Sequence, residues 1–161
     1  MKIRVLFVCH GNICRSPMAE FVFRDMVQKR GAEHLFEIAS AATSTEEIGN
    51  PVHPGTRRIL SQHGISTAGK YARQLAHQDG QHYDYIIGMD QRNMVNMNRI
   101  LGKASKDKLH KLLDFSGEGR DVDDPWYTGD FVKTYEDVWN GCAALLEQIA
   151  RDYELPFDER Y

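Results

Sequence analysis

The chain has 161 residues, of which 42% are hydrophobic and 27% are charged, and its formal net charge is -3. This composition is typical of one globular domain that buries its own core. The net negative charge argues against a nucleic-acid partner, which requires a basic surface. No segment approaches the ~20 apolar residues that cross a bilayer, so we expect no membrane partner.

The cysteines and the N-terminal residues indicate the compartment. Three cysteines are an odd and small set, which does not build a disulfide framework. Only the short apolar run "VLFV" follows the basic residues Lys2 and Arg4, and it is too short for a secretory leader. Because free thiols persist in a reducing environment, we expect a cytoplasmic protein.

Strand and helix patterns alternate from the N-terminus. Residues 3–8 form a continuous β-rich apolar run, which predicts a strand buried on both faces. Apolar positions at helical spacing then predict a helix that begins with Ser16 as N-cap and Pro17 in the first position and ends at Gly31. The segment "LFEIASAAT", residues 35–43, predicts a second strand.

The same alternation continues through residue 130. We expect a helix over 55–63, a buried strand over 83–89 and a helix over 90–101. The segment "KLHKLLDF", residues 108–115, is an ambiguous fourth strand. Residues 116–130 are polar and rich in glycine, which predicts a loop.

The last helix has the clearest pattern. Apolar side chains recur every three or four residues on one face: Tyr135, Val138, Trp139, Cys142, Leu145, Leu146 and Ile149. Alternating strands and helices imply right-handed βαβ units and a doubly wound α/β domain. Ligands of such sheets bind beyond the carboxyl ends of the strands.

The stretch "VCHGNICRSP" lies at that edge and contains two cysteines. Cys9 and Cys14 have the spacing C-x4-C, but no second ligand pair accompanies them, so we predict no metal site. A buried structural thiol suits Cys142 on its apolar helix face. It does not suit Cys9, which stands beside a Gly-Asn turn and an arginine.

An anion site explains more of this stretch. A loop between a strand and a helix aims backbone N–H groups and the helix dipole at one point, which favours a thiolate at Cys9. Arg15 adds a planar fork for two phosphate oxygens. Gly11 and Asn12 tolerate the left-handed backbone that such a loop needs, and Ser16 can either cap the helix or hydrogen-bond the sulfur. These residues predict phosphoryl transfer through a cysteine.

A cysteine nucleophile also needs a general acid for the leaving group. Asp124 is the best candidate, because Pro125 restricts its backbone and stiffens the loop. Trp126 and Tyr127 follow, and they can form an aromatic wall for a flat substrate.

Four blocks of the chain resemble the low-molecular-weight protein tyrosine phosphatases. "CHGNICRS" resembles their C-x5-R-[ST] phosphate loop, and "DDPWYTGDF" resembles their acid loop. "SAATSTEEIGNP" and "YDYIIGMD" are similar to the intervening segments, and the blocks follow one another in the family's order. The resemblance implies one domain over 1–161, with a four-stranded parallel sheet in the order 2-1-3-4 flanked by helices.

The resemblance also implies the chemistry. Cys9 would attack phosphorus and form a phosphocysteine, while Arg15 and the amides of residues 10–15 would bind the phosphate oxygens. Asp124 would protonate the tyrosyl oxygen and then activate the water that releases inorganic phosphate. Phosphotyrosine proteins or peptides would be the substrates, and neither a metal nor another cofactor is implied.

Supporting roles follow from the same resemblance. Asn12 and Ser40 would hold the loop by hydrogen bonds, and Ser16 would favour the thiolate. The family's phosphate-binding and loop-shaping positions are His10, Gly11, Asn12, Ile13, Cys14, Ser16 and Ser40. The positions that line its substrate pocket are Ile13, Glu46, Glu47, Trp126 and Tyr127.

Three features of the chain stay open at this point. Cys14 is either a small buried loop residue or, as the resemblance suggests, the redox partner that forms a reversible disulfide with oxidised Cys9. His10 stands where the family is often apolar, either exposed at the rim or tuning the pH response. "GISTAGKYARQL" is one residue longer than the family pattern, so no site residue is assigned there.

Three other functions share parts of this sequence pattern with a tyrosine phosphatase. A thiol-dependent arsenate reductase needs two further cysteines for a disulfide cascade, and the buried position expected for Cys142 does not supply them. Within the family that the chain resembles, hydrolysis of phosphoarginine is associated with a threonine at the position of Ile13, and the branched apolar side chain of Ile13 suits a tyrosyl ring better. A non-catalytic phosphate-binding or redox-sensing module needs neither a nucleophile nor an acid. We therefore predict a tyrosine phosphatase, which is a monomer or, through an exposed aromatic patch, a weak homodimer.

Overall fold

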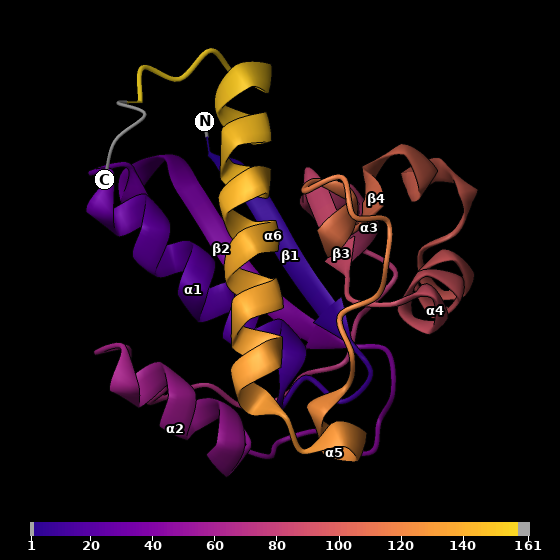
Figure 1. The fold of residues 1–161 in the computed structure, drawn as a ribbon. Coiled ribbons are helices and arrows are strands. Elements are labelled where there is room, and N and C mark those ends of the chain that lie inside the picture. Colours follow the sequence, from indigo (N-terminus) through magenta and orange to yellow (C-terminus); the bar gives the residue numbers. More distant parts are fainter. Residues whose placement is uncertain (1, 158–161) are drawn as a thin grey trace.

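Four parallel strands form one sheet in the order β2-β1-β3-β4 in the computed structural model, which describes residues 2–157 (Figure 1). The strands are β1 (Ile3–Cys9), β2 (Phe36–Ala42), β3 (Tyr85–Gly88) and β4 (Leu109–Lys111). β1 lies in the middle and pairs with β2 on one side and β3 on the other. The predicted four-stranded parallel sheet and its order are confirmed.

Helices flank the sheet. The α-helices are α1 (Arg15–Lys29), α2 (Pro54–Gln62), α3 (Asp79–His82), α4 (Gln91–Leu101), α5 (Pro125–Thr128) and α6 (Phe131–Asp152). Short 3-10 helices are η1 (Glu33–Leu35), η2 (Lys103–Lys108) and η3 (Leu112–Asp114). α1 and α6 pack against each other in front of the sheet in Figure 1, and α4 packs on β3 and β4.

The alternation of side chains along β1 divides the core into two parts. Val5 and Phe7 point into the larger cluster, which also contains the buried faces of α1 and α6. Leu6 and Val8 point into the smaller cluster, together with residues of α4 such as Met97. Because both faces of β1 are buried, its sequence is a continuous apolar run rather than an alternating one.

The predicted elements are present, with shorter strands at β3 and β4 than the sequence indicated. The ambiguous segment 108–115 divides into the three-residue strand β4 and the 3-10 turn η3. The predicted loop over 116–130 contains one helical turn, α5, which begins at Pro125. Proline starts a helix readily, because its fixed φ suits the first turn and its missing N–H is not needed there.

Two further expectations were wrong. Ser16 is not the N-cap of α1: that position is Cys14, which makes no side-chain capping bond. Trp139 does not belong to the buried face of α6, since it is 41% exposed. The buried face instead includes the small or polar residues Gly141 and Asp137.

None of the described helices is long and apolar enough to span a bilayer.

Gly141 allows α6 to pack closely against η3. A Cβ at this position would lie 2.5 Å from Cγ of Leu112, which is fully buried. Gly141→Ala should lower the free energy of unfolding by about 1–3 kcal/mol through overpacking, which exceeds the ~0.5–1 kcal/mol gain in helix propensity. Urea denaturation measures the change, with the exposed Asn140→Ala on the same helix as control. A Gly141→Ala variant as stable as wild type would contradict this packing.

Candidate active site

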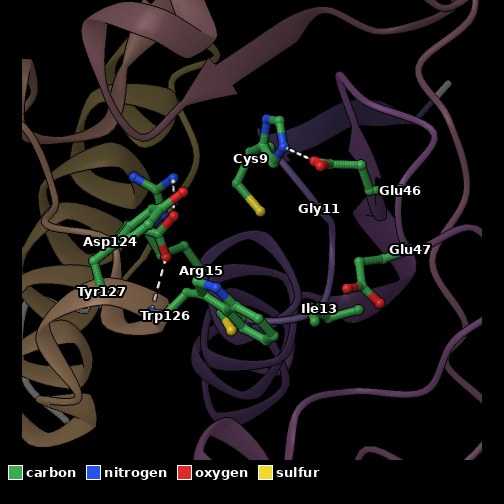
Figure 2. A pocket seen from close by; sticks show the side chains of 11 residues that line it. Cys9, Gly11, Ile13, Arg15, Glu46, Glu47, Asp124, Trp126 and Tyr127 are labelled. Atoms are coloured by element: carbon green, nitrogen blue, oxygen red, sulfur yellow. Dashed lines mark hydrogen bonds and ion pairs between the residues drawn. The ribbon is translucent and has the colours of Figure 1, made fainter.

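A pocket of about 160 Å³ opens at the carboxyl edge of the sheet (Figure 2). It is lined by Cys9, His10, Gly11, Ile13, Cys14, Arg15, Glu46, Glu47, Asp124, Trp126 and Tyr127. These residues come from the loop after β1, the loop after β2 and the segment at α5. The pocket therefore lies at the edge of the sheet where the doubly wound pattern predicts ligand binding.

The loop between β1 and α1 is held by the side chain of Asn12. Asn12 has a positive φ of 60°, a conformation that asparagine tolerates. Its Nδ2 donates to Oγ of Ser16 at 2.7 Å and to Oγ of Ser40 at 2.9 Å, and its Oδ1 accepts from the backbone N–H of Arg73 at 3.1 Å. Because Asn12, Ser16 and Ser40 are buried, these bonds give the loop one well-determined shape.

The sulfur of Cys9 is surrounded by donors. The backbone N–H groups of Asn12 and Ser16 point at Sγ from 3.3 and 3.4 Å. Oγ of Ser16 lies 3.1 Å from the same sulfur. Ser16 therefore bonds the sulfur instead of capping the helix, and the start of α1 adds its positive dipole end. These donors are placed to stabilise negative charge on the sulfur.

The guanidinium of Arg15 is 2% exposed and is held from two sides. Nη1 donates to Oδ2 of Asp90 at 2.7 Å and to the carbonyl oxygen of Val122 at 2.8 Å. Nη2 lies 3.5 Å from Oδ2 of Asp124. Burial lowers the pKa of Arg15, but the neighbouring Cys9 and Asp90 outweigh this and raise it above its ordinary value. Arg15 is therefore a permanent cation at the pocket wall.

Asp90 was not identified from the sequence. It lies two residues after the end of β3 and caps α4, accepting from the backbone N–H of Asn93 at 2.7 Å, while its other oxygen orients Arg15. The sequence did contain a signal for Asp90, because a carboxylate just after a buried strand lies at the edge of the sheet where ligands bind.

Asp124 lies on the other side of Arg15 as the N-cap of α5. Its Oδ1 accepts from the backbone N–H of Trp126 at 3.0 Å. Two nearby aspartates do not line the pocket: Asp121 pairs with Lys111 at 3.0 Å, and Asp123 is exposed. Of the three, the structure brings only Asp124 to Arg15 and the pocket.

The rim has an aromatic side and an acidic side, which lie across the pocket from each other in Figure 2. Trp126 is 58% exposed and packs edge-on against the ring of His53, while Tyr127 stands further out. On the acidic side, Glu46 forms an ion pair with His10, which places His10 at the rim. The expected pocket residues thus surround the opening.

A buried polar network beneath the loop was also missed. Oγ of Ser40 donates to Oε1 of Glu20 at 2.5 Å. Lys70 pairs with Glu20 at 3.3 Å and donates to the carbonyl oxygen of Ser40 at 3.0 Å. Lys70 and Arg73 belong to the segment that received no assignment, and Glu20 is a buried carboxylate among the mainly apolar buried residues of α1. In the described part of the chain, no group of three His, Cys, Asp or Glu side chains is placed to hold a metal ion.

The other two cysteines have different surroundings from Cys9, although all three are free thiols. Burial, together with the neighbouring Cys9, raises the pKa of Cys14 to about 12. Cys142 is fully buried in α6, and burial raises the pKa of its thiol well above the usual value.

Iodoacetate at pH 7 should therefore label Cys9 alone. With a pKa of about 12, only roughly 10⁻⁵ of Cys14 is a thiolate at this pH, and thiolates are the reactive form. Peptide mass spectrometry should find one labelled site, protected by inorganic phosphate and absent from Cys9→Ser. Labelling of Cys14 before Cys9 would contradict this assignment.

A family model and two relatives of the chain carry similar descriptions. A family model described as low molecular weight phosphotyrosine protein phosphatase matches residues 4–155. The low molecular weight protein-tyrosine-phosphatase YfkJ of Bacillus subtilis (strain 168) is 43% identical over 155 residues, which are 95% of this chain and 99% of that protein. PtpA of Staphylococcus aureus (strain Newman), which has the same description, is 40% identical over 154 residues. The match covers 95% of this chain and 97% of PtpA.

Solved structures agree with the sequence matches. The crystal structure of YfkJ matches with a TM-score of 0.92 over 94% of this chain and 97% of that chain. The low molecular weight protein tyrosine phosphatase SP-PTP from Streptococcus pyogenes is 39% identical, with a TM-score of 0.85 over 98% of this chain and 100% of that chain. The family resemblance drawn from the four sequence blocks is confirmed. The chain belongs to the low molecular weight phosphotyrosine protein phosphatase family.

Proposed function

We propose that this phosphatase hydrolyses phosphotyrosine in proteins or peptides through a phosphocysteine on Cys9. The observation that carries the proposal is the meeting of three groups in one pocket: the sulfur of Cys9 among N–H donors, the buried cation of Arg15, and the carboxyl of Asp124. These are a nucleophile, a phosphate clamp and a proton donor, which together are sufficient for phosphoryl transfer without a metal.

In the first step, the Cys9 thiolate attacks phosphorus, and the bond to the tyrosyl oxygen breaks. Arg15 and the backbone N–H groups of residues 10–15 bind the equatorial phosphate oxygens, where charge is greatest in the transition state. Asp124 gives its proton to the departing oxygen, so that neutral tyrosine leaves. Ser16 stabilises the thiolate before attack, and Asn12 and Ser40 keep the loop in its shape.

In the second step, the carboxylate of Asp124 takes a proton from water. The resulting hydroxide attacks phosphorus, the bond between sulfur and phosphorus breaks, and inorganic phosphate leaves. Cys9 returns to the thiolate and Asp124 to the acid, so the cycle balances without a further reactant.

The pocket walls suit a phenyl ring. Ile13 and the ring of Trp126 supply apolar surface, and Tyr127 extends the wall outward. Glu46 and Glu47 supply negative charge at the opposite rim. A cytoplasmic location is part of the proposal, supported by the three free thiols. The exposed Trp126 and Tyr127 are compatible with a monomer or a weak homodimer.

Replacing the acid should affect substrates unequally. Asp124→Ala should lower kcat/KM for phosphotyrosine by roughly 10²–10⁴-fold and for p-nitrophenyl phosphate far less, because p-nitrophenolate leaves without a proton. Steady-state kinetics on the two substrates measure this, with the exposed Asp123→Ala as the matched control. Cys9→Ser should abolish both activities. Full activity of Cys9→Ser, or equal losses on both substrates in Asp124→Ala, would overturn the mechanism.

We also propose that Cys14 protects Cys9 from irreversible oxidation. Peroxide converts the Cys9 thiolate to a sulfenic acid, which condenses with the Cys14 thiol to give a disulfide and water. Both thiols line the same pocket. After peroxide treatment, dithiothreitol should restore the activity of wild type and of Cys142→Ser but not of Cys14→Ser. Equal recovery of Cys14→Ser would remove this role.

A further inference from the structure

The segment between Arg120 and Asp137 carries the proposed acid and both pocket aromatics, and its two ends are joined. Nη2 of Arg120 donates to Oδ1 of Asp137 at 2.7 Å, and Nη1 donates to Oδ2 at 3.1 Å. The two residues are 17 positions apart. This bidentate, charge-assisted pair therefore closes a loop that contains Asp124, α5 and the first turns of α6.

Asp137 is a fixed anchor for the loop. Its side chain is 7% exposed, and it belongs to α6, which packs along α1. Lys133, one turn earlier, also donates to it at 3.1 Å. Burial raises the pKa of Asp137, but hydrogen bonds from Arg120 and Lys133 outweigh this, so its pKa lies below the ordinary value. The anchor is thus an ionised carboxylate on a rigid helix.

Arg120 stands outside the pocket. Its side chain is 42% exposed, it does not belong to the pocket lining, and its other side-chain partner is Glu118 at 3.1 Å. A direct role in binding the substrate therefore does not explain its paired geometry. Its place in the chain does: the side chain of Arg120 is bonded to α6, and two residues later the carbonyl oxygen of Val122 accepts from Arg15.

The contacts beyond Arg120 show why its position matters. The N–H of Val122 donates to the carbonyl oxygen of Met89 at 2.9 Å, and the carbonyl oxygen of Val122 accepts from Arg15. Asp124 itself reaches Arg15 only at 3.5 Å. Asp124 has only this long contact to Arg15, so its place depends on how the flanking chain is held: by Val122 and Asp121 close to it, and by Arg120 where the segment begins.

We propose that Arg120, through its two hydrogen bonds to Asp137, is a positioning residue that keeps Asp124 over the phosphate loop. This rests on the proposed role of Asp124 as the acid. When the pair is removed, the carboxyl group shifts relative to the leaving oxygen, while Cys9, Arg15 and the loop amides keep their places. Protonation of the leaving group is then impaired and phosphate binding is not.

The test compares Arg120→Met with Lys133→Met, which removes the other cation on Asp137 and leaves the Arg120 fork intact. For each, kcat/KM is measured with phenyl phosphate and with p-nitrophenyl phosphate, and inorganic phosphate is used as a competitive inhibitor. For Arg120→Met we expect phenyl phosphate to lose on the order of tenfold more than p-nitrophenyl phosphate, with phosphate inhibition unchanged. Lys133→Met should keep the wild-type ratio. Arg120→Lys, with a single donor nitrogen in place of the two-nitrogen fork, should give a ratio between those of wild type and Arg120→Met.

Asp137→Asn provides a second variant that keeps an oxygen acceptor at the anchor. It should show the same selective loss, and the double variant with Arg120→Met should lose little more than either single one. A wild-type ratio in Arg120→Met, or a parallel weakening of phosphate inhibition, would overturn the inference. Asp124→Ala in the same assay separates the two proposals. If Asp124→Ala loses more activity on phenyl phosphate than on p-nitrophenyl phosphate and Arg120→Met does not, only the positioning role of Arg120 fails. If Asp124→Ala loses activity equally on both substrates, the acid role of Asp124 fails as well.

Discussion

The buried guanidinium of Arg15 is the constraint on which the rest of the site depends. A charge with 2% exposure is tolerated only if it is paired and hydrogen-bonded, because its hydration has been lost. Arg15 obtains these partners from segments far apart in the chain: Asp90 after β3, the carbonyl oxygen of Val122 after β4, and Asp124 at α5. Pairing the Arg15 cation therefore brings together the loop after β1, the segment after β3 and the segment that carries Asp124.

The same arrangement gives the two sides of the pocket different tasks. On the side of α1, the N–H groups around Cys9 and the network of Asn12, Ser40 and Glu20 hold a cradle for an anion. On the other side, Nη1 of Arg15 is occupied by Asp90 and Val122, whereas Nη2 has only the long contact to Asp124. Nη2 thus keeps donor capacity for a phosphate oxygen, and it lies next to the proposed acid.

Much of this site could be predicted from local patterns. Cys9, Arg15 and the turn residues between them lie within seven positions, so strand, loop and helix signals place them without further information. Asp124 was found because a nucleophile needs an acid and Pro125 marked a stiff turn. Asp90, Glu20 and Lys70 were missed, since each looks like an ordinary surface charge until the fold buries it or places it beside its partner. Of the two roles predicted for Ser16, the helix cap was wrong and the bond to the sulfur of Cys9 is present, because a serine before proline suits a helix start as well as a loop contact.

The sequence by itself determined the elements, the order of the sheet through family resemblance, and the residues that are proposed as nucleophile, phosphate clamp and acid. These depend on short-range patterns: apolar runs, helical spacing and a seven-residue loop. Only the tertiary structure decided which charges meet, such as Arg15 with Asp90 and Arg120 with Asp137. The physical reason is that ion pairs between distant segments leave no periodic trace in the chain. Their partners are chosen by which strand ends and helix faces the packed core brings into contact.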